Sequence, residues 1–589
     1  FDHTTYPGGV GTGGGICGYF HGAKGGLQTE IDRRTQDMTV LLAGASAGPD
    51  GWHHEAKKLV LLDCFEEAGV TFLGGALLAG VERDPAGTVS AAIVAVDGHL
   101  SRIPARAFID GTGDGDLAAL AGAGFLIGRP GDARTLSYSQ SIFSLLTREH
   151  RTGVRSCNFD AGWVDPFDPE DLSHARLTGI AQHLQPVWTH PGSPVAVSPL
   201  LGLRQSRQID TDVRVTLVDL IGHARFPDSV GNVETVADTH SVDYEFESDE
   251  MAFYYWTCRG FRHRLRCELP YRMLLPRGLA NVWVPSRAAG IDVEAAYGLR
   301  MQREMQRLGE VSGLAAAQAA THRTHARGID LAALQSALDR SGARGVDQPE
   351  KPAPTLDAQL AALDTGLPGV HLWHLARLPE PARQAVLTRL ASTEPRVSFY
   401  AATLLAMWGD SAAEPRLLRA LESQETGPAP EERPVPGAFA QCIDIPFWLQ
   451  AALLLRRVGS ARCLPALFAI TTRPGLPFNV RTTLALTLER LAARLGAHPQ
   501  LLAALDALLA EEISDSVLPP SRSLWRTLAR EPQKKLGNDR GAPVAQDHAW
   551  QLHLVVARLR QTLGLPPRPE VETFKRDPRG FVRRAFAAF

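Results

Sequence analysis

Hydrophobic and polar positions follow two regimes along the chain, first with mixed spacing and later with helical spacing. Apolar residues recur every three or four positions from about His54 to Glu67, which predicts a helix, and a short strand is expected at 70–73. Three β-type runs between 77 and 110, separated by turn residues, predict an antiparallel meander. The first part of the chain is therefore predicted to be mixed α/β.

A mixed stretch and a second apolar segment follow. Residues 128–269 are rich in Trp, Tyr, Phe, His and Arg without clean helical periodicity, which is expected of an inserted substrate or cap region. From Leu279 an apolar run predicts a buried strand that leads into a glycine turn. Helical spacing then continues from about Glu294 to Ala320, which predicts one long helix.

The C-terminal part has the spacing of helical repeats. A proline- and charge-rich segment, Gly342–Asp357, predicts a linker, and the chain beyond it is rich in Leu, Ala and Arg. Two stretches that begin at Ala401 and Ala451 match in Ala, Ala, Leu, Leu, Gly, Pro and Leu at equal offsets. Each predicts helix, small-residue turn, helix, and a weaker third copy is expected from Val480. The repeat is slightly longer than the ~40–47 residues of HEAT units, with 426–437 as the expected insertion, and stacked pairs predict an all-α HEAT-like solenoid.

Composition and charge exclude several classes of function. The 589-residue chain has a formal net charge of −3 and no Lys or Arg run, so we expect neither a nucleic-acid nor a membrane partner. No apolar run approaches the ~20 residues of a membrane span and no signal peptide is visible, so a cytoplasmic protein is expected. Seven scattered cysteines without a CxxC pair argue against a disulfide framework and against a structural zinc site.

The turn within the stretch FIDGTGDGDLAALAGAGF allows three interpretations. Its glycines suit a phosphate or dinucleotide cradle, a metal loop, or a tight connection from strand to helix. A calcium loop of the EF-hand type would end in a glutamate about twelve residues on, where here an apolar helix begins. In the other interpretations Asp110 ends a strand, and Asp114 or Asp116 caps the helix that starts near Leu117.

A second glycine-rich stretch, YPGGVGTGGGICGYFHG, lies near the start of the chain. Glycine within an element costs up to about 1 kcal/mol relative to alanine, so its repeated use indicates backbone that approaches a ligand closely. The pair Gly8 and Gly9, followed by Thr12, suits a loop whose amides and hydroxyl contact a pyrophosphate. The alternative is a disordered glycine-rich terminus.

Four stretches together resemble one family. GGVGTGGG, RAFIDGTGDGDLAALAGA, LGLRQSRQI and LPYRMLLPRGLANVWVPSRAAG are similar to the FAD-dependent oxidoreductases of the glutathione-reductase-type flavoprotein superfamily, over residues 7–325. The second and fourth stretches are the specific ones. The resemblance implies a Rossmann-like FAD-binding domain, non-covalent FAD, and a small organic substrate.

The resemblance also implies positions for the cofactor. Backbone and hydroxyl groups near the pyrophosphate and flavin would come from Gly8, Gly9, Thr12 and Gly13. The nucleotide half would lie near Gly111, Thr112, Gly113 and Asp114, with backbone groups of Val81 close to the adenine. The ribityl and pyrimidine ends would be covered by Ser286, Arg287, Ala288 and the helix that reaches Arg300.

The sequence departs from the family pattern in two places. The family opens with a strand, GxGxxG and a helix, and no such unit precedes Gly8, so we expect an N-terminally incomplete copy of a larger protein. Pro285-Ser286-Arg287 stands where the family carries a Gly-Arg pair, and Gly309–Gly313 replaces its Gly-Gln-Ala-Ala-Gly-like segment. The flavin contacts assigned to this second region are affected by that departure.

Polar residues of the inserted region are the candidates for chemistry. The family implies hydride transfer between a substrate C–H bond and the flavin, assisted by an acid or base. His240 is flanked by Asp238 and Asp243, either of which would orient it as a base, although a single histidine is more often structural. Arg204 and Arg207 are candidates for clamping an anionic substrate with paired donors. Tyr271 and Arg272 lie where the chain re-enters the FAD domain, and His21 lies close to the flavin loop in sequence.

These observations lead to one main hypothesis and two alternatives. The main one is an FAD-dependent oxidoreductase whose α/β domain carries an inserted α+β cap and precedes an all-α solenoid that mediates assembly or covers the active site. The expected units are 1–127 and 270–341 for the incomplete FAD domain, 128–269 for the cap, 342–357 for the linker and 358–589 for the solenoid. The alternatives are a solenoid scaffold with a degenerate flavoprotein-like domain, which binds a protein partner or itself, and a dehydrogenase that uses NAD(P) alone. The last lacks a second dinucleotide fingerprint.

Overall fold

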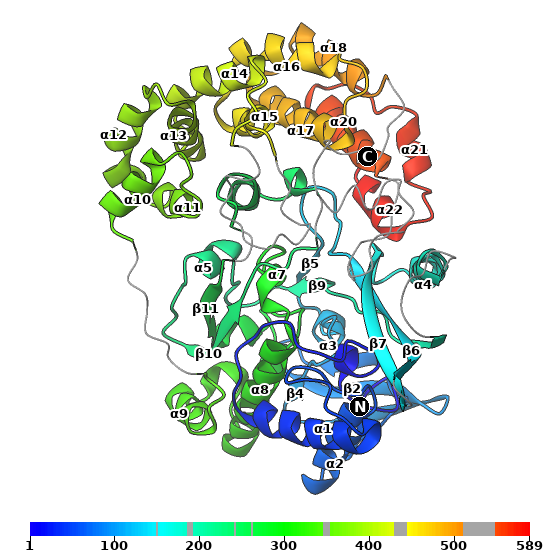
Figure 1. The fold of residues 1–589 in the computed structure, drawn as a ribbon. Coiled ribbons are helices and arrows are strands. Elements are labelled where there is room, and N and C mark those ends of the chain that lie inside the picture. Colours follow the sequence, from blue (N-terminus) through cyan, green and yellow to red (C-terminus); the bar gives the residue numbers. More distant parts are fainter. Residues whose placement is uncertain are drawn as a thin grey trace.

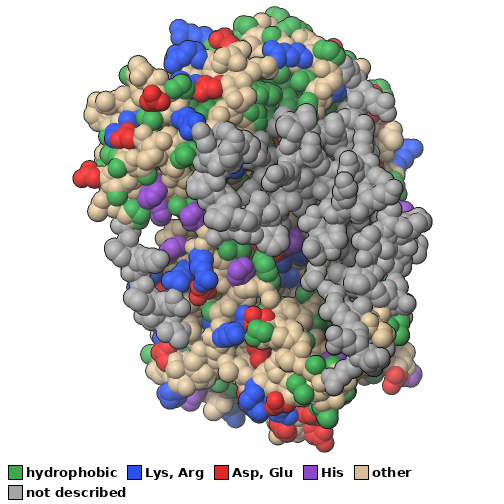
Figure 2. Space-filling model, in the orientation of Figure 1, with side chains coloured by type: hydrophobic (Ala, Val, Ile, Leu, Met, Phe, Trp, Pro, Cys, Tyr) green, Lys and Arg blue, Asp and Glu red, His purple; other side chains and the backbone are tan. Residues whose placement is uncertain are grey.

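The computed structural model describes residues 1–148, 151–184, 193–240, 243–260, 263–345, 354–428, 445–510 and 548–589. The C-terminal helices form an arc over a mixed α/β part, and the N-terminus lies at the opposite end of the molecule from that arc (Figure 1). Among the described residues on the face seen in Figure 2, acidic and basic side chains are interspersed and no large patch of one sign stands out, in keeping with the small net charge.

The first elements largely follow the predicted pattern. Helices α1 (Leu27–Ala43) and α2 (Ala56–Glu67) pack against each other, and β1 (Leu77–Arg83), β2 (Val89–Val96) and β3 (His99–Pro104) form the expected antiparallel meander. The strand predicted at 70–73 is wrong. An isolated parallel bridge between Asp2 and Gly74 is what the chain forms there.

Two short parallel strands hold the centre of the α/β part. β4 (Phe108–Ile109) pairs with β12 (Val282–Trp283), about 170 positions later in the chain, and the buried residues 282–284 form the apolar strand that the sequence predicts. Helix α3 (Asp116–Leu120) follows β4. The predicted cap by Asp114 or Asp116 is wrong, because Asp110 reaches across the turn and accepts hydrogen bonds from the amide of Ala118 at 3.0 Å and from Thr112.

The region between these strands is built from small sheets and short helices. The sheets pair β5 (Phe125–Ile127) with β9 (Arg207–Ile209), β10 (Ser229–Thr235) with β11 (Leu265–Pro270), and β6 (Tyr138–Arg148) with both β7 (Arg151–Gly162) and β8 (Ser193–Val197). Its helices are α4 (Pro169–Leu184), α5 (Leu217–Ile221) and α6 (Asp249–Ala252), the last continuing as a turn of π-helix at Phe253–Thr257.

Three helices complete the α/β part, namely α7 (Ala296–Leu299), α8 (Gln302–His322) and α9 (Leu331–Ser341). The single helix predicted over 294–320 is therefore two helices. The break lies at Met301, whose ψ of 147° is extended rather than helical. Of the predicted linker, residues 346–353 lie outside the described residues.

The C-terminal arc is all-α. It comprises α10 (Leu356–Asp364), α11 (His371–Ala376), α12 (Pro379–Leu390), α13 (Pro395–Met407), α14 (Glu414–Glu422), α15 (Phe447–Val458), α16 (Leu464–Thr471), α17 (Phe478–Leu495), α18 (Pro499–Leu508), α20 (Ala549–Thr562), α21 (Glu570–Phe574) and α22 (Gly580–Phe586).

The two best repeat copies have the predicted form. The pair α13 and α14 and the pair α15 and α16 are each joined by a short turn with a glycine, Gly409 or Gly459, and α14 packs on α15. The chain from Val480 also lies in a helix pair, because α17 leads through a turn at Gly496 into α18, although α17 is longer than α13 or α15. The predicted insertion lies mostly outside the described residues, since 429–444 are not described.

Candidate functional site

The first glycine-rich loop is a tight turn close to the surface. Gly8 and Gly9 have φ of 108° and 53°, and Gly9–Gly11 forms one turn of 3-10 helix. Such φ values favour glycine, and a side chain at Gly9 would meet open space, so this backbone is accessible. Thr12 is buried and its hydroxyl donates to the carbonyl of Pro7 at 2.9 Å, so the hydroxyl faces the protein rather than the surface.

The second loop, after β4, combines three of the predicted positions. A guanidinium nitrogen of Arg287 donates to a carboxylate oxygen of Asp114 at 2.6 Å, and a Cβ at Gly113 would lie 2.8 Å from the same guanidinium. Gly111 is exposed and faces open space. Arg207 also belongs here, because it donates to the Asp114 carbonyl at 3.1 Å and to Asp116 at 2.6 Å. These contacts hold Arg207 at the second loop, apart from Arg204, its predicted partner in an anion clamp.

One chain segment, residues 200–206, connects the two loops. The amide of Leu200 donates to the carbonyl of Gly13 at 3.3 Å, and the hydroxyl of Ser206 donates to the carbonyl of Gly113 at 3.4 Å. Six residues span at most about 22 Å, which limits how far apart the two loops lie. Gln302 also reaches the first loop, donating to the carbonyl of Ile16 at 3.0 Å.

The remaining predicted cofactor residues lie around these loops. Ser286 and Ala288 are buried, and the Ser286 hydroxyl accepts from the Ala288 amide at 3.3 Å beside the second loop. Val81 lies in β1 opposite Ala92, in the meander. The two exposed glycine turns therefore fit a ligand that needs backbone amides at two places, as a dinucleotide does.

Two predicted residues contact Asp238, which follows β10. Nε2 of His240 lies 2.8 Å from Asp238 Oδ2, within hydrogen-bond distance, and Arg300 donates to the same oxygen at 2.9 Å and to the Asp238 carbonyl at 3.0 Å. These three side chains are 15%, 10% and 13% exposed for His240, Arg300 and Asp238. The arrangement is a nearly buried carboxylate with a histidine and an arginine on it.

Two more predicted residues, Arg204 and His21, interact electrostatically with Asp238. Burial raises the pKa of Asp238, but the charges of His240, Arg300 and Arg204 outweigh burial and hold it below the ordinary value. Burial lowers the pKa of His21, and the charge of Asp238 opposes that effect. Both histidines also have left-handed backbone, with φ of 60° at His21 and 46° at His240, an uncommon conformation for residues other than glycine.

The other candidates lie elsewhere. The hydroxyl of Tyr271 donates to the carbonyl of Ala326 at 2.8 Å and accepts from Trp283 at 2.7 Å, so it connects buried elements. Arg272 forms an ion pair with Asp228 at 2.9 Å. These contacts join the re-entering chain to the core and do not involve the Asp238 cluster.

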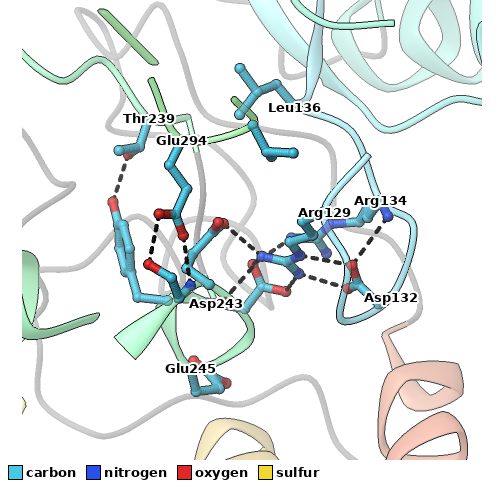
Figure 3. A network of polar contacts seen from close by, with 12 residues as sticks. Arg129, Asp132, Arg134, Leu136, Thr239, Asp243, Glu245 and Glu294 are labelled. Atoms are coloured by element: carbon cyan, nitrogen blue, oxygen red, sulfur yellow. Dashed lines mark hydrogen bonds and ion pairs between the residues drawn. The ribbon is translucent and has the colours of Figure 1, made fainter. Parts of the chain in front are cut away.

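A buried charge network next to this cluster was missed by sequence reasoning. Arg129 lies between Asp132 and Asp243 (Figure 3), with nitrogen–oxygen distances of 2.7 and 2.6 Å, and it contacts Glu247 at 2.8 Å. Arg134 also pairs with Asp243. A cavity of ≈ 10 Å³, about the space of one water molecule, touches the network and the Asp238 cluster; its polar lining comes from Arg129, Arg134, Thr135, Gln205, His240, Glu247 and Tyr297.

The helical arc closes over this network. Gln551 of α20 donates to Asp132 and to Asp243, both at 2.7 Å. The hydroxyl of Thr482, in α17, donates to Glu245 at 2.7 Å, and Arg457 of α15 pairs with Asp249. The inner faces of α15, α17 and α20 therefore pack on the segment 243–257, which begins three residues after His240.

Two carboxyl groups of this region are protonated more readily than usual. Burial, with the neighbouring charge of Asp243, raises the pKa of Glu245 to about 8. Burial and the charge of Glu247 raise the pKa of Glu294 to about 8, although Glu294 accepts hydrogen bonds from the amide and hydroxyl of Ser248 at 2.6 and 2.7 Å. Both groups are largely neutral at pH 7.

Comparison with known proteins supports the family expectation. Residues 1–190 and 182–338, more than half of the chain, match the family model described as FAD dependent oxidoreductase. The chain belongs to this family of FAD-dependent oxidoreductases. The match contains both glycine loops, Asp238 and His240, and it ends before the helical arc.

Other comparisons add little to this assignment. No curated protein matches the chain. A solved structure of the complex of CpcE and CpcF of phycocyanin lyase from Nostoc sp. PCC7120 is 19% identical, over 41% of this chain and 66% of that one, with a TM-score of 0.20, which carries no argument. Across the described helices, none combines the length and apolar character that a membrane span requires. Within the described ranges, His, Cys, Asp and Glu side chains form no group that could bind a metal ion.

Proposed function

We propose that this chain is an oxidoreductase that transfers a hydride between a small organic substrate and FAD. The observation that carries the proposal is the contact of His240 and Arg300 with the buried carboxylate of Asp238, within the family-matched region. Buried, perturbed ionisable groups of this kind cluster at functional sites. Bound FAD supplies the hydride acceptor or donor, and the residues proposed to hold it are the backbone of Gly8, Gly9, Gly13, Gly111 and Gly113, with Thr112, Asp114 and Arg287 beside them.

His240 is proposed as the acid or base and Asp238 as its positioning residue. Oxidation of the substrate would release a hydride from carbon, which FAD accepts when bound, and a proton from the hydroxyl or amine, which a nitrogen of His240 would take. The carboxylate of Asp238, 2.8 Å from Nε2, orients the ring and stabilises the imidazolium that forms. Atoms and charges balance, because the pair of electrons leaves with the hydride and the proton stays on the imidazole.

The charges around the site favour an anionic substrate. Arg300 and Arg204 contribute two positive charges against the single carboxylate of Asp238. A substrate carboxylate within reach of this excess positive charge would be held by charge-assisted hydrogen bonds. We therefore propose small carboxylic acids that carry a hydroxyl or amine on an oxidisable carbon.

The test starts from the purified chain mixed with FAD. Affinity is measured by quenching of flavin fluorescence, and the flavin-loaded protein is then mixed anaerobically with a panel of hydroxy acids and amino acids while flavin absorbance is followed. We expect FAD binding, bleaching by at least one acid, and loss of bleaching but not of FAD binding in His240→Gln. His99→Gln, an exposed histidine of β3, is the matched control. Absence of FAD binding, or bleaching that is equal in His240→Gln and wild type, would contradict the proposal.

The rival, an interaction scaffold, would need a free inner face on the helical arc. Much of that face is covered by the chain's own segment 243–257, through α15, α17 and α20. This packing supports the proposal that the arc encloses the substrate site. Association with a protein partner or with a second copy is accordingly proposed for the outer surface of the arc.

A further inference from the structure

A buried lysine lies beneath the first glycine loop. The side chain of Lys57, in α2, is 5% exposed, and its Nζ donates to the hydroxyl of Tyr19 at 2.7 Å. The ammonium lies 4.2 Å from the ring centroid of Trp52 and 4.7 Å from that of Tyr19. The carboxylate of Asp32 is 4.0 Å away. Two aromatic rings and one hydroxyl thus surround the ammonium of Lys57, and among the described residues no carboxylate lies closer to it than that of Asp32.

The same two rings connect the lysine to the loop and to α8. The indole N–H of Trp52 donates to the carbonyl of Gly11 at 3.0 Å, in the 3-10 turn of the loop. The hydroxyl of Tyr19 donates to Asp32 at 2.5 Å. The guanidinium of Arg303, from α8, lies 4.2 Å from the ring centroid of Tyr19. The loop backbone is therefore held by an indole whose ring packs on the ammonium.

An apolar side chain would fill this position at lower cost. Burying an ammonium costs several kcal/mol unless it is well compensated, whereas a cation over an aromatic face recovers ~1–2 kcal/mol per contact. Ala56 and Val60 on the same helix are buried and apolar, as an ordinary helix face would be. A charge kept at this cost beside a cofactor loop is consistent with a role in that loop.

We propose that Lys57 is a positioning residue for FAD, whose charged ammonium holds Trp52 and Tyr19 and thereby keeps Gly8–Gly13 in its binding conformation. This inference rests on the proposed function, because it assigns the loop to the cofactor. Its consequence is that FAD affinity depends on the protonation of Lys57.

The pH range follows from the surroundings of the amine. Burial lowers the pKa of Lys57 to about 8, with the charge of Asp32 opposing burial and that of Arg303 adding to it. Burial raises the pKa of Cys17 to about 12 and that of Tyr19 above its ordinary value, so neither loses its proton near pH 8. Lys57 is then the group of this cluster that changes charge between about pH 7 and pH 9.

The experiment compares FAD affinity in wild type, Lys57→Met, Lys57→Arg and Lys58→Met from about pH 6 to about pH 9.5. Lys58, the next residue, pairs with Glu55 at 2.7 Å, and its ammonium lies 4.2 Å from the ring centroid of Tyr6. Lys58→Met therefore removes a cation beside the same loop that holds neither Trp52 nor Tyr19 in the described structure, and it is the matched control. We expect wild-type and Lys58→Met affinity to fall through about pH 8 and Lys57→Arg to bind tightly without the fall. Lys57→Met should bind about tenfold more weakly than wild type at pH values well below 8, show no fall of its own, and approach the wild-type affinity above pH 8. Equal affinity of Lys57→Met and wild type at low pH, or a fall that persists in Lys57→Arg, would overturn the inference.

A second readout needs no cofactor. Amide hydrogen exchange of residues 8–15 should be faster in Lys57→Met than in wild type or Lys58→Met, and unchanged exchange would overturn the inference. If no variant binds FAD but Lys57→Met still loosens the loop, the proposed function fails while the role of Lys57 in the loop stands. Should Lys57→Met fold poorly by circular dichroism, Lys57→Arg carries the test through its pH profile.

Discussion

Replacing Glu245 by glutamine should remove much of the pH dependence of the docking between the helical arc and the segment 243–257. Glu245 is buried in that interface and accepts a hydrogen bond from Thr482 at 2.7 Å, which a glutamine oxygen can also accept. Its pKa is raised from 4.5 to about 8, first by burial and then by the charge of Asp243. Because the folded state holds this proton and the unfolded state releases it, stability falls as pH rises from about 4.5 to about 8.

The magnitude follows from the two pKa values. At ~1.36 kcal/mol per pH unit, the interval from 4.5 to about 8 corresponds to roughly 5 kcal/mol lost by the wild type and not by Glu245→Gln. Amide exchange of peptides that cover Tyr244–Phe246, from about pH 5 to about pH 9, measures the free energy of local opening. Glu294, whose pKa is also about 8, leaves a residual slope in both proteins.

Glu66→Gln, at an exposed position of α2, controls for the loss of one carboxylate. The reasoning is refuted if Glu245→Gln and wild type lose stability in parallel between about pH 5 and about pH 8. It is equally refuted if the variant is less stable than wild type at pH 9, because a neutral side chain should then be the favourable one.

Two further changes test the site and its helical cover. Gln551→Leu removes two hydrogen bonds to buried carboxylates and should lower the free energy of unfolding by about 2–4 kcal/mol in urea denaturation. Gln561→Leu, at an exposed position of the same helix, should change the free energy of unfolding by less than about 0.5 kcal/mol. Equal effects of the two substitutions would contradict the role of Gln551 in the charge network. Asp238→Asn should keep FAD affinity but slow flavin bleaching by roughly 10²- to 10⁴-fold in stopped-flow absorbance and shift its pH profile, and an unchanged profile would remove Asp238 from the proposed mechanism.

The hydrophobic pattern within a short window was enough to predict those helices and strands whose formation depends on residues close in sequence. The meander β1–β3 and the helix pairs from Ala401 and Ala451 follow from spacing within a few turns of chain. The strand predicted at 70–73 failed because a strand needs a partner ladder, and there the chain makes only one isolated bridge. Asp110 caps α3 instead, because it lies at the end of β4, close enough for its carboxylate to accept a hydrogen bond from the Ala118 amide across the turn.

The candidate site was predicted in part for the same reason. His240 and Asp238 are two residues apart, so their contact is visible in sequence, but the arrival of Arg300 on Asp238 joins positions 62 apart. The charge network was hidden because Gln551 lies 419 positions from Asp132, and nothing in a local window predicts such a pairing. A signal did exist in the segment GRPGDAR, where Arg129, Asp132 and Arg134 crowd together, but surface and buried charges look alike in one sequence.

The central claim is that FAD and an acid–base pair of His240 and Asp238 act together in this chain. Anaerobic bleaching of bound flavin by a small hydroxy or amino acid, compared between wild type and His240→Gln at matched FAD occupancy, tests it most directly. The account predicts that the wild type bleaches and that His240→Gln binds FAD equally well but bleaches at least about a hundredfold more slowly. A chain that binds no FAD, or a His240→Gln variant that bleaches at the wild-type rate, would contradict it.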